Sequence, residues 1–371
     1  MKRNGILFCF TVSLMLLIES SGASGLTTPQ VGNDAATQTS IQTAATKSTT
    51  LAVTPAKVTI GTVQDYFPVK PNTRYVYAGS GNEYASYDVL VDYSQGSKFQ
   101  QRVDNGGTVT ARVIEVKDGV AKLVFTRAEV YYRENFLKNK ANQSEILLKG
   151  PLRAGTKWKL SDGRERRINS TSASVSTPSG NYSAVEVVTK SKDGITTDYY
   201  AKNVGLVKSV FKYGDTEVTS SLSAIEKDKP FVQTVRFFYP NMDDESVDSV
   251  EASVRFRTND ITRIVLAQAY RDALSNQSAK VFSKNTKINS LYLNRDGMVY
   301  IDLNRAFVDE MNAGSGYEAL ILQSVANTFG VYYGVDKVLL TIDNKLYESG
   351  HIALKKGEYL KVKLDSAKKL K

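Results

Sequence analysis

The chain has 371 residues, of which 42% are hydrophobic and 23% charged, and its formal net charge at neutral pH is +10. Its only cysteine is Cys9 and its only histidine is His351. These counts exclude a disulfide framework and a zinc site built from cysteine and histidine. The sequence also has no phosphate-binding loop, dinucleotide fingerprint or nucleophile elbow. We therefore expect no catalytic residues, no cofactor and no bound metal.

The first 23 residues have the pattern of a signal peptide. Lys2 and Arg3 are followed by an apolar run over residues 6–18, and small residues lead to Ala23. The sequence predicts export and cleavage near Ala23, which places the protein outside the cytoplasm, at the cell envelope. An uncleaved anchor is the alternative, although a bilayer span takes about 20 apolar residues. Cys9 lies inside the apolar run rather than after small residues, which argues against a lipid anchor.

Residues 24–60 are dominated by Thr, Ala, Gln and Ser and show no sustained hydrophobic period. Such a composition buries too little apolar surface to offset the entropy of ordering. We expect a flexible linker. It is either a spacer that holds the folded part away from a membrane or wall, or a connection without a selected length.

Residues 61–228 are predicted to form an all-β domain. Short alternating runs are separated by turn pairs such as Asp118-Gly119 and Asp193-Gly194. No long amphipathic helix interrupts them. The pattern predicts an antiparallel sheet of eight or more strands, closed into a barrel or folded as a sandwich. The sequence does not decide between these two forms.

Aromatic residues are frequent in this β domain. They either line a groove that stacks on glycan or holds lipid, or fill the core of the domain. The residues concerned are Tyr66, Phe67, Tyr75, Tyr77, Tyr84, Tyr87, Tyr93, Tyr131, Tyr132, Trp158, Tyr199 and Tyr200.

Residues 231–360 are predicted to form an α/β domain with helices against one face of a mixed sheet. Strands are expected over residues 234–240 and 250–257, followed by a helix over 261–274 that is capped by Asn259 or Asp260. A hairpin follows, with arms over 291–293 and 299–303 and a two-residue type I′ turn at Asp296-Gly297.

A second helix in this region is predicted to begin at a capping box formed by Ser315 and Glu318, and to end at Gly334 in the left-handed conformation. The last strand covers residues 337–343 and leads into a turn at Asp343-Asn344. Overall, the sequence predicts an α+β protein.

Three phrases in this region resemble the GerMN domain family of sporulation and spore germination proteins. They are VRFFYP at 235–240, LYLNRDGMVYIDL at 291–303 and GVDKVLLTID at 334–343. The resemblance covers about a third of the chain. It implies a fold related to ring-building motifs, a non-catalytic interaction module, and an exported protein of a Gram-positive bacterium. The family commonly has Asp-Gly where this chain has Asp343-Asn344, and asparagine also tolerates the left-handed region.

Carboxylates are the remaining candidates for catalysis, since glycoside hydrolysis needs two of them across a cleft. The candidates are Asp243, Asp244, Glu245, Asp302, Asp309, Glu310 and Glu318. The alternation of the hairpin strand predicts an outward-facing Asp302, Glu318 is explained as a cap, and the acids of 243–245 belong to a solvated loop. His351 is expected at the surface.

Residues 361–371 are predicted to be a lysine-rich tail. Together with Lys355 and Lys356, its lysines either bind anionic wall polymers or a membrane surface, or form a frayed, solvated terminus. Nucleic acid is not an expected partner of an exported chain.

These observations favour an exported envelope protein with a GerMN interaction or assembly module that serves sporulation or germination, with envelope proteins or further copies of itself as partners. Two alternatives remain open: a glycan- or lipid-binding protein that acts through the aromatic β domain, and a carboxylate-based peptidoglycan hydrolase.

Overall fold

The computed structural model describes residues 61–274, 279–365 and 367–370. Residues from Gly61 onward form one compact unit. The predicted signal peptide and linker lie outside the described residues. Within the part that is described, no helix is long and apolar enough to cross a membrane.

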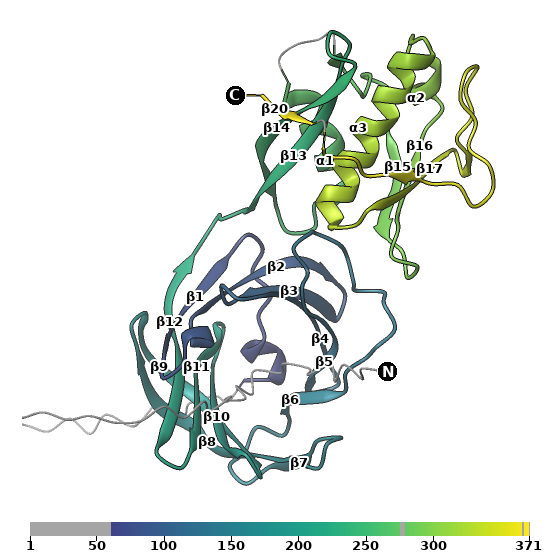
Figure 1. Cartoon of the computed structure of the whole chain (residues 1–371). Helices are drawn as coiled ribbons and strands as arrows, with labels where there is room; N and C mark the ends of the chain where they lie inside the picture. Colours follow the sequence, from purple (N-terminus) through teal and green to yellow (C-terminus); the bar gives the residue numbers. More distant parts are fainter. Residues whose placement is uncertain (1–60, 275–278, 366, 371) are drawn as a thin grey trace, which may run out of the picture. The chain divides into compact units, whose positions relative to one another are not determined.

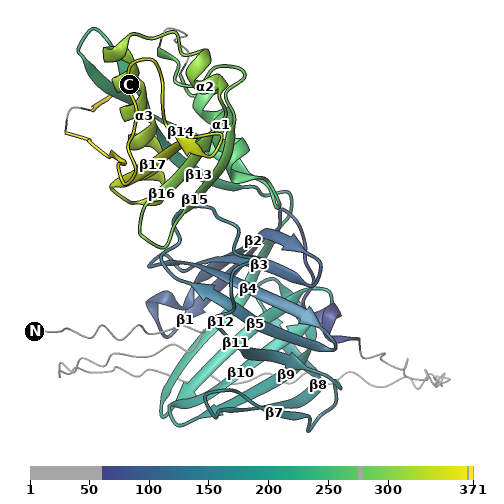
Figure 2. The same ribbon diagram turned by 90° about the vertical axis from the view of Figure 1, so that its right-hand side faces the viewer.

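Twelve antiparallel strands form the first half of this unit (Figures 1 and 2). Two short 3₁₀ helices, η1 (Val63–Tyr66) and η2 (Glu83–Ala85), accompany them. The strands are β1 (Arg74–Ser80), β2 (Tyr87–Gln95), β3 (Lys98–Asp104), β4 (Val109–Lys117), β5 (Val120–Arg127), β6 (Glu145–Lys149), β7 (Lys157–Lys159), β8 (Glu165–Thr177), β9 (Gly180–Ser191), β10 (Gly194–Ala201), β11 (Gly205–Tyr213) and β12 (Thr216–Glu226).

The sheet curls into a nearly closed barrel, which decides between the two forms left open by the sequence (Figure 1). Its edge strands are β6 and β7, and side chains rather than a backbone ladder join them. The indole N–H of Trp158 donates to the carbonyl of Ile146 at 3.0 Å, and Arg166 donates to the same carbonyl at 2.7 Å. Arg166 also pairs with Glu145 at 2.5 Å. These bonds reduce the free edge that an open sheet would leave.

Local turn chemistry sets the register of the barrel. The hairpin predicted at Asp118-Gly119 is confirmed, since β4 and β5 pair across it and both turn residues have positive φ, 51° and 70°. A two-residue turn with positive φ at both positions matches the twist of the flanking strands. Seven of the aromatic residues are buried in core clusters: Tyr66, Tyr75, Tyr77, Tyr93, Tyr132, Trp158 and Tyr200. For these rings, core packing is the role that the structure shows.

The second half of the unit contains three helices and two small sheets. Its elements are β13 (Phe231–Asn241), β14 (Ser246–Phe256), α1 (Thr262–Asp272), β15 (Ile288–Leu293), β16 (Val299–Leu303), α2 (Ala306–Asp309), α3 (Ser315–Tyr333), β17 (Lys337–Ile342), β18 (Lys345–Leu346), β19 (Leu360–Lys361) and β20 (Lys368–Lys369). The predicted strands and the two longer helices are confirmed, but the strands form two sheets rather than one. The first contains β13, β14 and β20; the second is mixed and contains β15 to β19, with β16 parallel to β17.

One large apolar core runs through this half and continues onto the barrel wall. Phe237, Tyr270, Phe282 and Phe329 are each at most 2% exposed, and the same cluster includes Phe136 from the connection between β5 and β6. Helix α3 packs against β13 and β17 (Figure 2). The α/β part therefore shares its core with the wall of the barrel.

Both predicted helix caps are wrong. Ile261 occupies the N-cap of α1 without a side-chain bond, while the Asp260 carboxylate accepts from the Arg257 amide at 2.7 Å. Gly314 is the N-cap of α3. Glu318 is instead 2% exposed and accepts from the Tyr347 hydroxyl at 2.8 Å. Glu318 therefore accepts from a donor far away in the sequence instead of from the backbone amide that a capping box would provide.

Of the two turns predicted in the α/β part, one is longer than expected and the other is confirmed. Between β15 and β16, Asn294 N donates to Met298 O, so the turn encloses three residues, including Gly297 at φ 79°, instead of the predicted two at Asp296-Gly297. The turn predicted at Asp343-Asn344 is confirmed, with positive φ at both positions, 48° and 65°. The left-handed end of α3 at Gly334, φ 69°, is confirmed.

The C-terminal lysines are more ordered than a frayed tail. β20 pairs in parallel with β14. Lys368 contacts Asp244 at 2.6 Å and Lys369 contacts Glu251 at 2.8 Å. Those two lysines therefore pair with the protein's own acids, and the prediction of a frayed terminus is wrong for them.

The empty N-cap of α1 predicts a stabilising substitution. Ile261 is 52% exposed and has the extended backbone of an N-cap, φ −80° and ψ 104°. In Ile261→Asp, the new carboxylate can accept from the free amide of the first turn, which raises the free energy of unfolding by about 1 kcal/mol. Urea denaturation measures the change. Ile261→Ala, which has no acceptor, is the control, and equal stability of the two variants would contradict the explanation.

Candidate functional site

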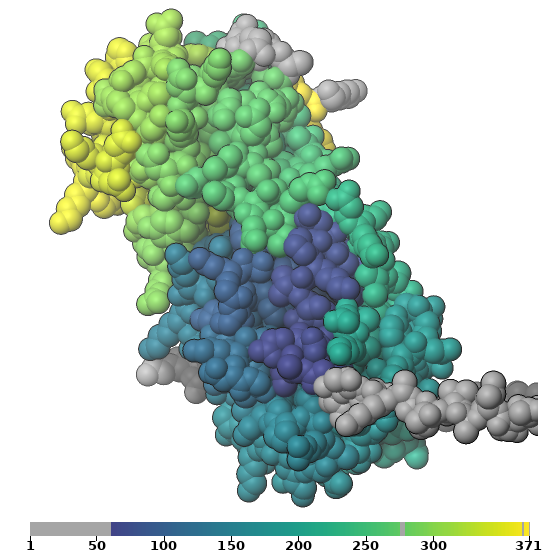
Figure 3. Space-filling model, turned by 180° about the vertical axis from the view of Figure 1, so that it is seen from behind, coloured from purple at the N-terminus to yellow at the C-terminus, as the bar shows by residue number. Residues whose placement is uncertain are grey.

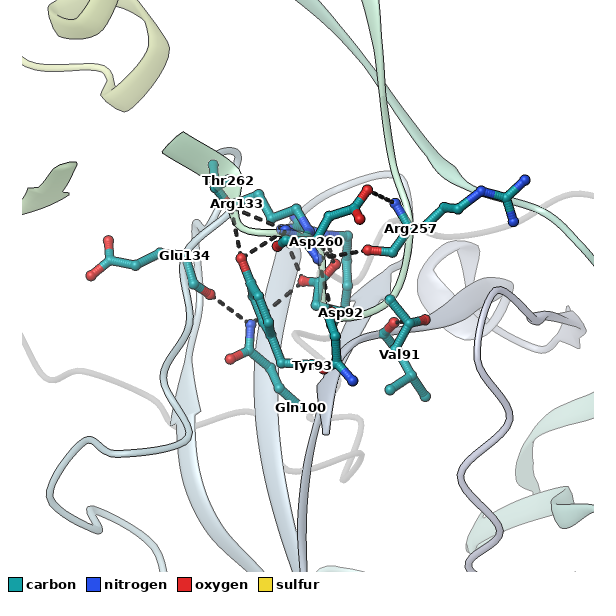
Figure 4. A network of polar contacts seen from close by, with 12 residues as sticks. Val91, Asp92, Tyr93, Gln100, Arg133, Glu134, Arg257, Asp260 and Thr262 are labelled. Carbon is teal, nitrogen blue, oxygen red and sulfur yellow. Dashed lines mark hydrogen bonds and ion pairs between the residues drawn. The ribbon is translucent and has the colours of Figure 1, made fainter. Parts of the chain in front are cut away.

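A buried arginine holds together the segments where the barrel meets the α/β part. Arg133 lies in the connection between β5 and β6 and is 1% exposed. Its guanidinium donates to the backbone carbonyls of Asp92 at 2.9 Å, Arg257 at 2.9 Å and Asp260 at 2.5 Å. It also donates to Thr262 Oγ1 at 3.0 Å. One side chain thus links the barrel, the end of β14 and the start of α1 (Figure 4).

Asp92 supplies the negative charge for this arginine and for a second one. Its carboxylate lies 3.6 Å from Arg133 Nε and 3.1 Å from Arg102 Nη2, and all three side chains are at most 5% exposed. Arg102 donates further to the carbonyls of Val130 and Tyr132, each at 2.9 Å. Charges withdrawn from water persist only with such close compensation. The network therefore fixes the path of the connection between β5 and β6.

Hydroxyl groups complete the network. The Tyr93 hydroxyl lies 2.7 Å from Thr262 Oγ1 and accepts from Arg133 at 2.8 Å. At the end of α3, the Tyr332 hydroxyl accepts from the Arg133 amide at 3.0 Å. Three helical or strand ends therefore meet at one polar centre (Figure 4). On the outer surface, the green α/β part lies directly against the purple and blue barrel strands (Figure 3).

A cleft of about 550 Å³ opens beside this network. Five segments line it: the end of β2, the connection between β5 and β6, the start of α1, β15 and the end of α3. β15 is the edge strand of its sheet, with only β16 as neighbour. The Leu293 amide of β15 interacts with the Glu134 carboxylate, and the other outward-facing backbone groups of this strand are available to a partner. The rim includes two exposed apolar side chains, Ile261 at 52% and Tyr292 at 39%.

Glu134 is the only carboxylate that lines this cleft. Burial raises its pKa to about 7, although Arg127 and the Leu293 amide lower it. Its Oε2 atom is buried and has no hydrogen-bond partner among the described residues. Figure 4 shows its side chain extending away from Arg133, while its backbone carbonyl accepts from Gln100 at 2.9 Å. The cleft thus offers one carboxyl group and no second acid to pair with it.

The acids singled out from the sequence do not meet at a common site. Asp243, Asp244 and Glu245 are exposed in the turn between β13 and β14, and Asp309 and Glu310 are exposed at the end of α2. His351 is exposed as well. Among the described residues, no three His, Cys, Asp or Glu side chains form a group that could hold a metal ion.

The prediction that Asp302 faces outward is wrong. The residue is 3% exposed, and its carboxylate accepts from Thr341 at 2.6 Å, the Asn344 amide at 2.7 Å and Asn289 at 2.9 Å. Because β16 lies inside its sheet, this carboxylate ties neighbouring strands and the Asp343-Asn344 turn together. Hydrogen-bond donors of the fold therefore occupy both of its oxygens.

The described residues form a β-barrel followed by an α/β unit, with a buried ionic network between them and a cleft beside it. Residues 236–348 match the family Germane, whose description is sporulation and spore germination. This confirms the resemblance seen in the sequence. A search of curated proteins found no match to the chain.

Solved structures give matches of low identity. The first GerMN domain of the sporulation protein GerM from Bacillus subtilis is 17% identical, with a TM-score of 0.27, over 35% of this chain and 97% of that one. The tandem GerMN domains of the same protein are 16% identical, with a TM-score of 0.26, over 34% of this chain and 45% of theirs. This chain thus spans less than half of the tandem structure.

A third match is a Bacteroides fragilis protein with a YmcC-like fold, whose description proposes that it is exported. It is 14% identical, with a TM-score of 0.27, over 43% of this chain and 98% of that chain.

Sequence reasoning did not find Arg133, Asp92 or Glu134. The only signal was a charged residue inside an apolar context, such as Asp92 between Val91 and Tyr93. That pattern indicates a buried charge but does not identify its partner.

Asp92→Asn tests the network. The substitution leaves two buried guanidinium groups without their carboxylate, and we expect the free energy of unfolding to fall by about 3–5 kcal/mol. Urea denaturation measures the loss. Asp118→Asn makes the same chemical change at an exposed turn residue, where no comparable loss is expected. Similar stability for both variants would show that the buried network contributes little.

Glu134 predicts a pH dependence of stability. Because its pKa in the folded protein, about 7, lies above the ordinary 4.5, the folded state binds the proton more tightly than the unfolded state. Its contribution to the free energy of unfolding therefore falls as pH rises from 4.5 to about 7. Glu134→Gln removes this contribution. Denaturation curves at several pH values, compared between wild type and variant, measure it; parallel pH profiles would contradict the assignment.

Proposed function

We propose that the chain is an exported, non-catalytic protein of the cell envelope that acts in sporulation or spore germination through its α/β part. The observation that carries this proposal is the match of residues 236–348 to the Germane family. Two features support a binding role over a catalytic one: the cleft is lined by the single carboxylate Glu134, and Asp302 and Glu318 are occupied by structural hydrogen bonds.

The cleft is the surface through which this part binds its partner. β15 offers an unpaired strand edge, and Ile261 and Tyr292 offer exposed apolar contacts along the rim. An extended polypeptide adds to such an edge through backbone hydrogen bonds, and side-chain contacts supply selectivity. The partner is therefore an extended segment of another envelope protein. The buried network beside the cleft keeps the edge in place before binding.

A second contact is with anionic polymers of the wall. Lys355, Lys356, Lys361 and Lys363 are exposed near the C-terminus. Lys368 and Lys369 are exposed as well, but they pair with Asp244 and Glu251. Exposed cations attract anionic polymers in a manner that salt weakens. This contact retains the protein at the envelope and leaves the cleft free for its protein partner.

Crosslinking and capture of the full-length exported protein from envelopes of sporulating and vegetative cells tests the proposal. We expect a protein partner that is enriched in sporulating cells and lost with Ile261→Asp, because a charge replaces an apolar contact on the rim. The control Tyr213→Asp alters a 55% exposed side chain at the end of β11 and is expected to retain the partner.

Two results would contradict the proposal. One is capture of the same partner by both variants at equal yield, which would exclude the cleft. The other is release of muropeptides from purified sacculi by the wild-type protein but not by Glu134→Gln, which would show catalysis in the cleft.

A further inference from the structure

One cation in the cleft beside β15 is not used by the described part of the fold. Arg263 lies in the first turn of α1 and lines the cleft of about 550 Å³. It is half-buried, and within the described residues its guanidinium makes no hydrogen bond and no ion pair. A guanidinium presents its N–H donors in a planar fork that matches a carboxylate. Arg263 therefore brings an open positive charge to this cleft.

The other arginine that lines the cleft, Arg133, is used by the fold. Its guanidinium donates to the backbone carbonyls of Asp92, Arg257 and Asp260. The Asp92 carboxylate, 3.6 Å from its Nε, compensates its charge. An external anion at Arg133 would have to displace these bonds. Of the two arginines, Arg263 is the one that can bind an anion without breaking a bond among the described residues.

The open edge of β15 lies in the same cleft, and its register shows where a partner strand pairs. Asn294 N donates to Met298 O at 2.9 Å, and hydrogen-bonded pairs alternate along an antiparallel ladder. The next such pair is Tyr292 with Tyr300, so Leu291 directs its N–H and C=O away from β16. Leu291 lines the cleft, and no other described residue bonds to these two groups. They are therefore open to a partner strand.

The open cation and the open edge belong to neighbouring walls. Helix α1 packs against β15, and Arg263 and Leu291 both line the one cleft. An extended chain that pairs with Leu291 therefore runs beside the first turn of α1. Glu134 is the only carboxylate of the lining, so it disfavours a partner acid beside itself, whereas Arg263 favours one. Charge complementarity thus indicates both the sign and the place of a charge on the partner.

We propose that the partner segment carries an acidic side chain, which pairs with Arg263 while the backbone of the segment pairs with Leu291. This inference rests on the proposed function, since it names the charge that the extended partner presents at the cleft. Backbone pairing supplies affinity for any extended chain. A carboxylate that forms two parallel bonds with a guanidinium adds a fixed geometry. Arg263 is therefore the residue that selects among extended chains.

Selection from a phage-displayed library of random heptapeptides on the full-length protein tests this charge preference. We expect wild type to enrich peptides with Asp or Glu. Arg263→Glu is expected to enrich peptides with Lys or Arg, because the substitution reverses the charge beside β15. The control Arg255→Met removes an exposed arginine of β14 that does not line the cleft and is expected to enrich the same acidic peptides as wild type. This control separates Arg263 from general attraction to the net charge of +10.

Fluorescence anisotropy with one enriched peptide measures the contribution of the pair. We expect the same peptide with glutamine in place of its acid to bind wild type about tenfold more weakly, since a charge-assisted bond is lost. Both peptides are expected to bind Arg263→Met alike. The thermal midpoint of Arg263→Met is expected to equal that of wild type, because the variant loses no bond among the described residues.

Failure of this inference is distinguishable from failure of the proposed function. Peptides that bind wild type but not Ile261→Asp, without enrichment of acids or with equal affinity of the acid and glutamine forms, would refute the role of Arg263 and leave binding at the cleft intact. Absence of any peptide whose binding depends on Ile261 would contradict both. Loss of the acidic preference in Arg255→Met would also refute the role of Arg263. If Arg263→Glu does not fold, the peptide pair on wild type and Arg263→Met decides.

Discussion

The described structure depends on one constraint, which is that the buried positive charge of Arg133 must be compensated by nearby hydrogen-bond acceptors. A guanidinium that is 1% exposed needs hydrogen-bond acceptors in place of water, and here carbonyls of two segments, the end of β2 and the connection from β14 to α1, provide them. The connection between β5 and β6, the end of β2 and the entrance to α1 can meet only in this geometry. The shared apolar core then extends from this fixed point into both halves of the unit.

The same constraint supports the proposal that a partner binds at the cleft. Its walls come from segments that the buried network already orders. Binding of a partner to β15 would therefore cost little free energy for ordering the site. Glu134 borders the network without joining it, and its carboxylate is left with one unsatisfied oxygen. The cleft thus combines walls that the buried network holds in place with a single carboxyl group whose charge depends on pH.

Local sequence signals predicted much of the fold. The features that these signals did not predict depend on contacts between residues far apart in the sequence. Positive φ at Asp118-Gly119 and the left-handed end at Gly334 follow from backbone sterics within a few residues, and both appear in the structure. Glu318 has the right spacing for a capping box, yet Tyr347 and Ser349 donate to it from 29 and 31 residues away. Arg133 likewise finds carbonyl partners 41 and 124 residues away, which no sequence period encodes.

The contrast among the interior arginines gives a physical way to separate structural charges from functional ones. Arg102, Arg133 and Arg166 each donate to backbone carbonyls and pair with a carboxylate, so any external anion would have to displace bonds that hold the fold. Arg112 has no such bonds to lose within the described residues. A charge that is enclosed but unpaired costs stability, because burial removes water without replacing it. Arg112 therefore stands apart from the three arginines whose bonds tie segments of the fold together.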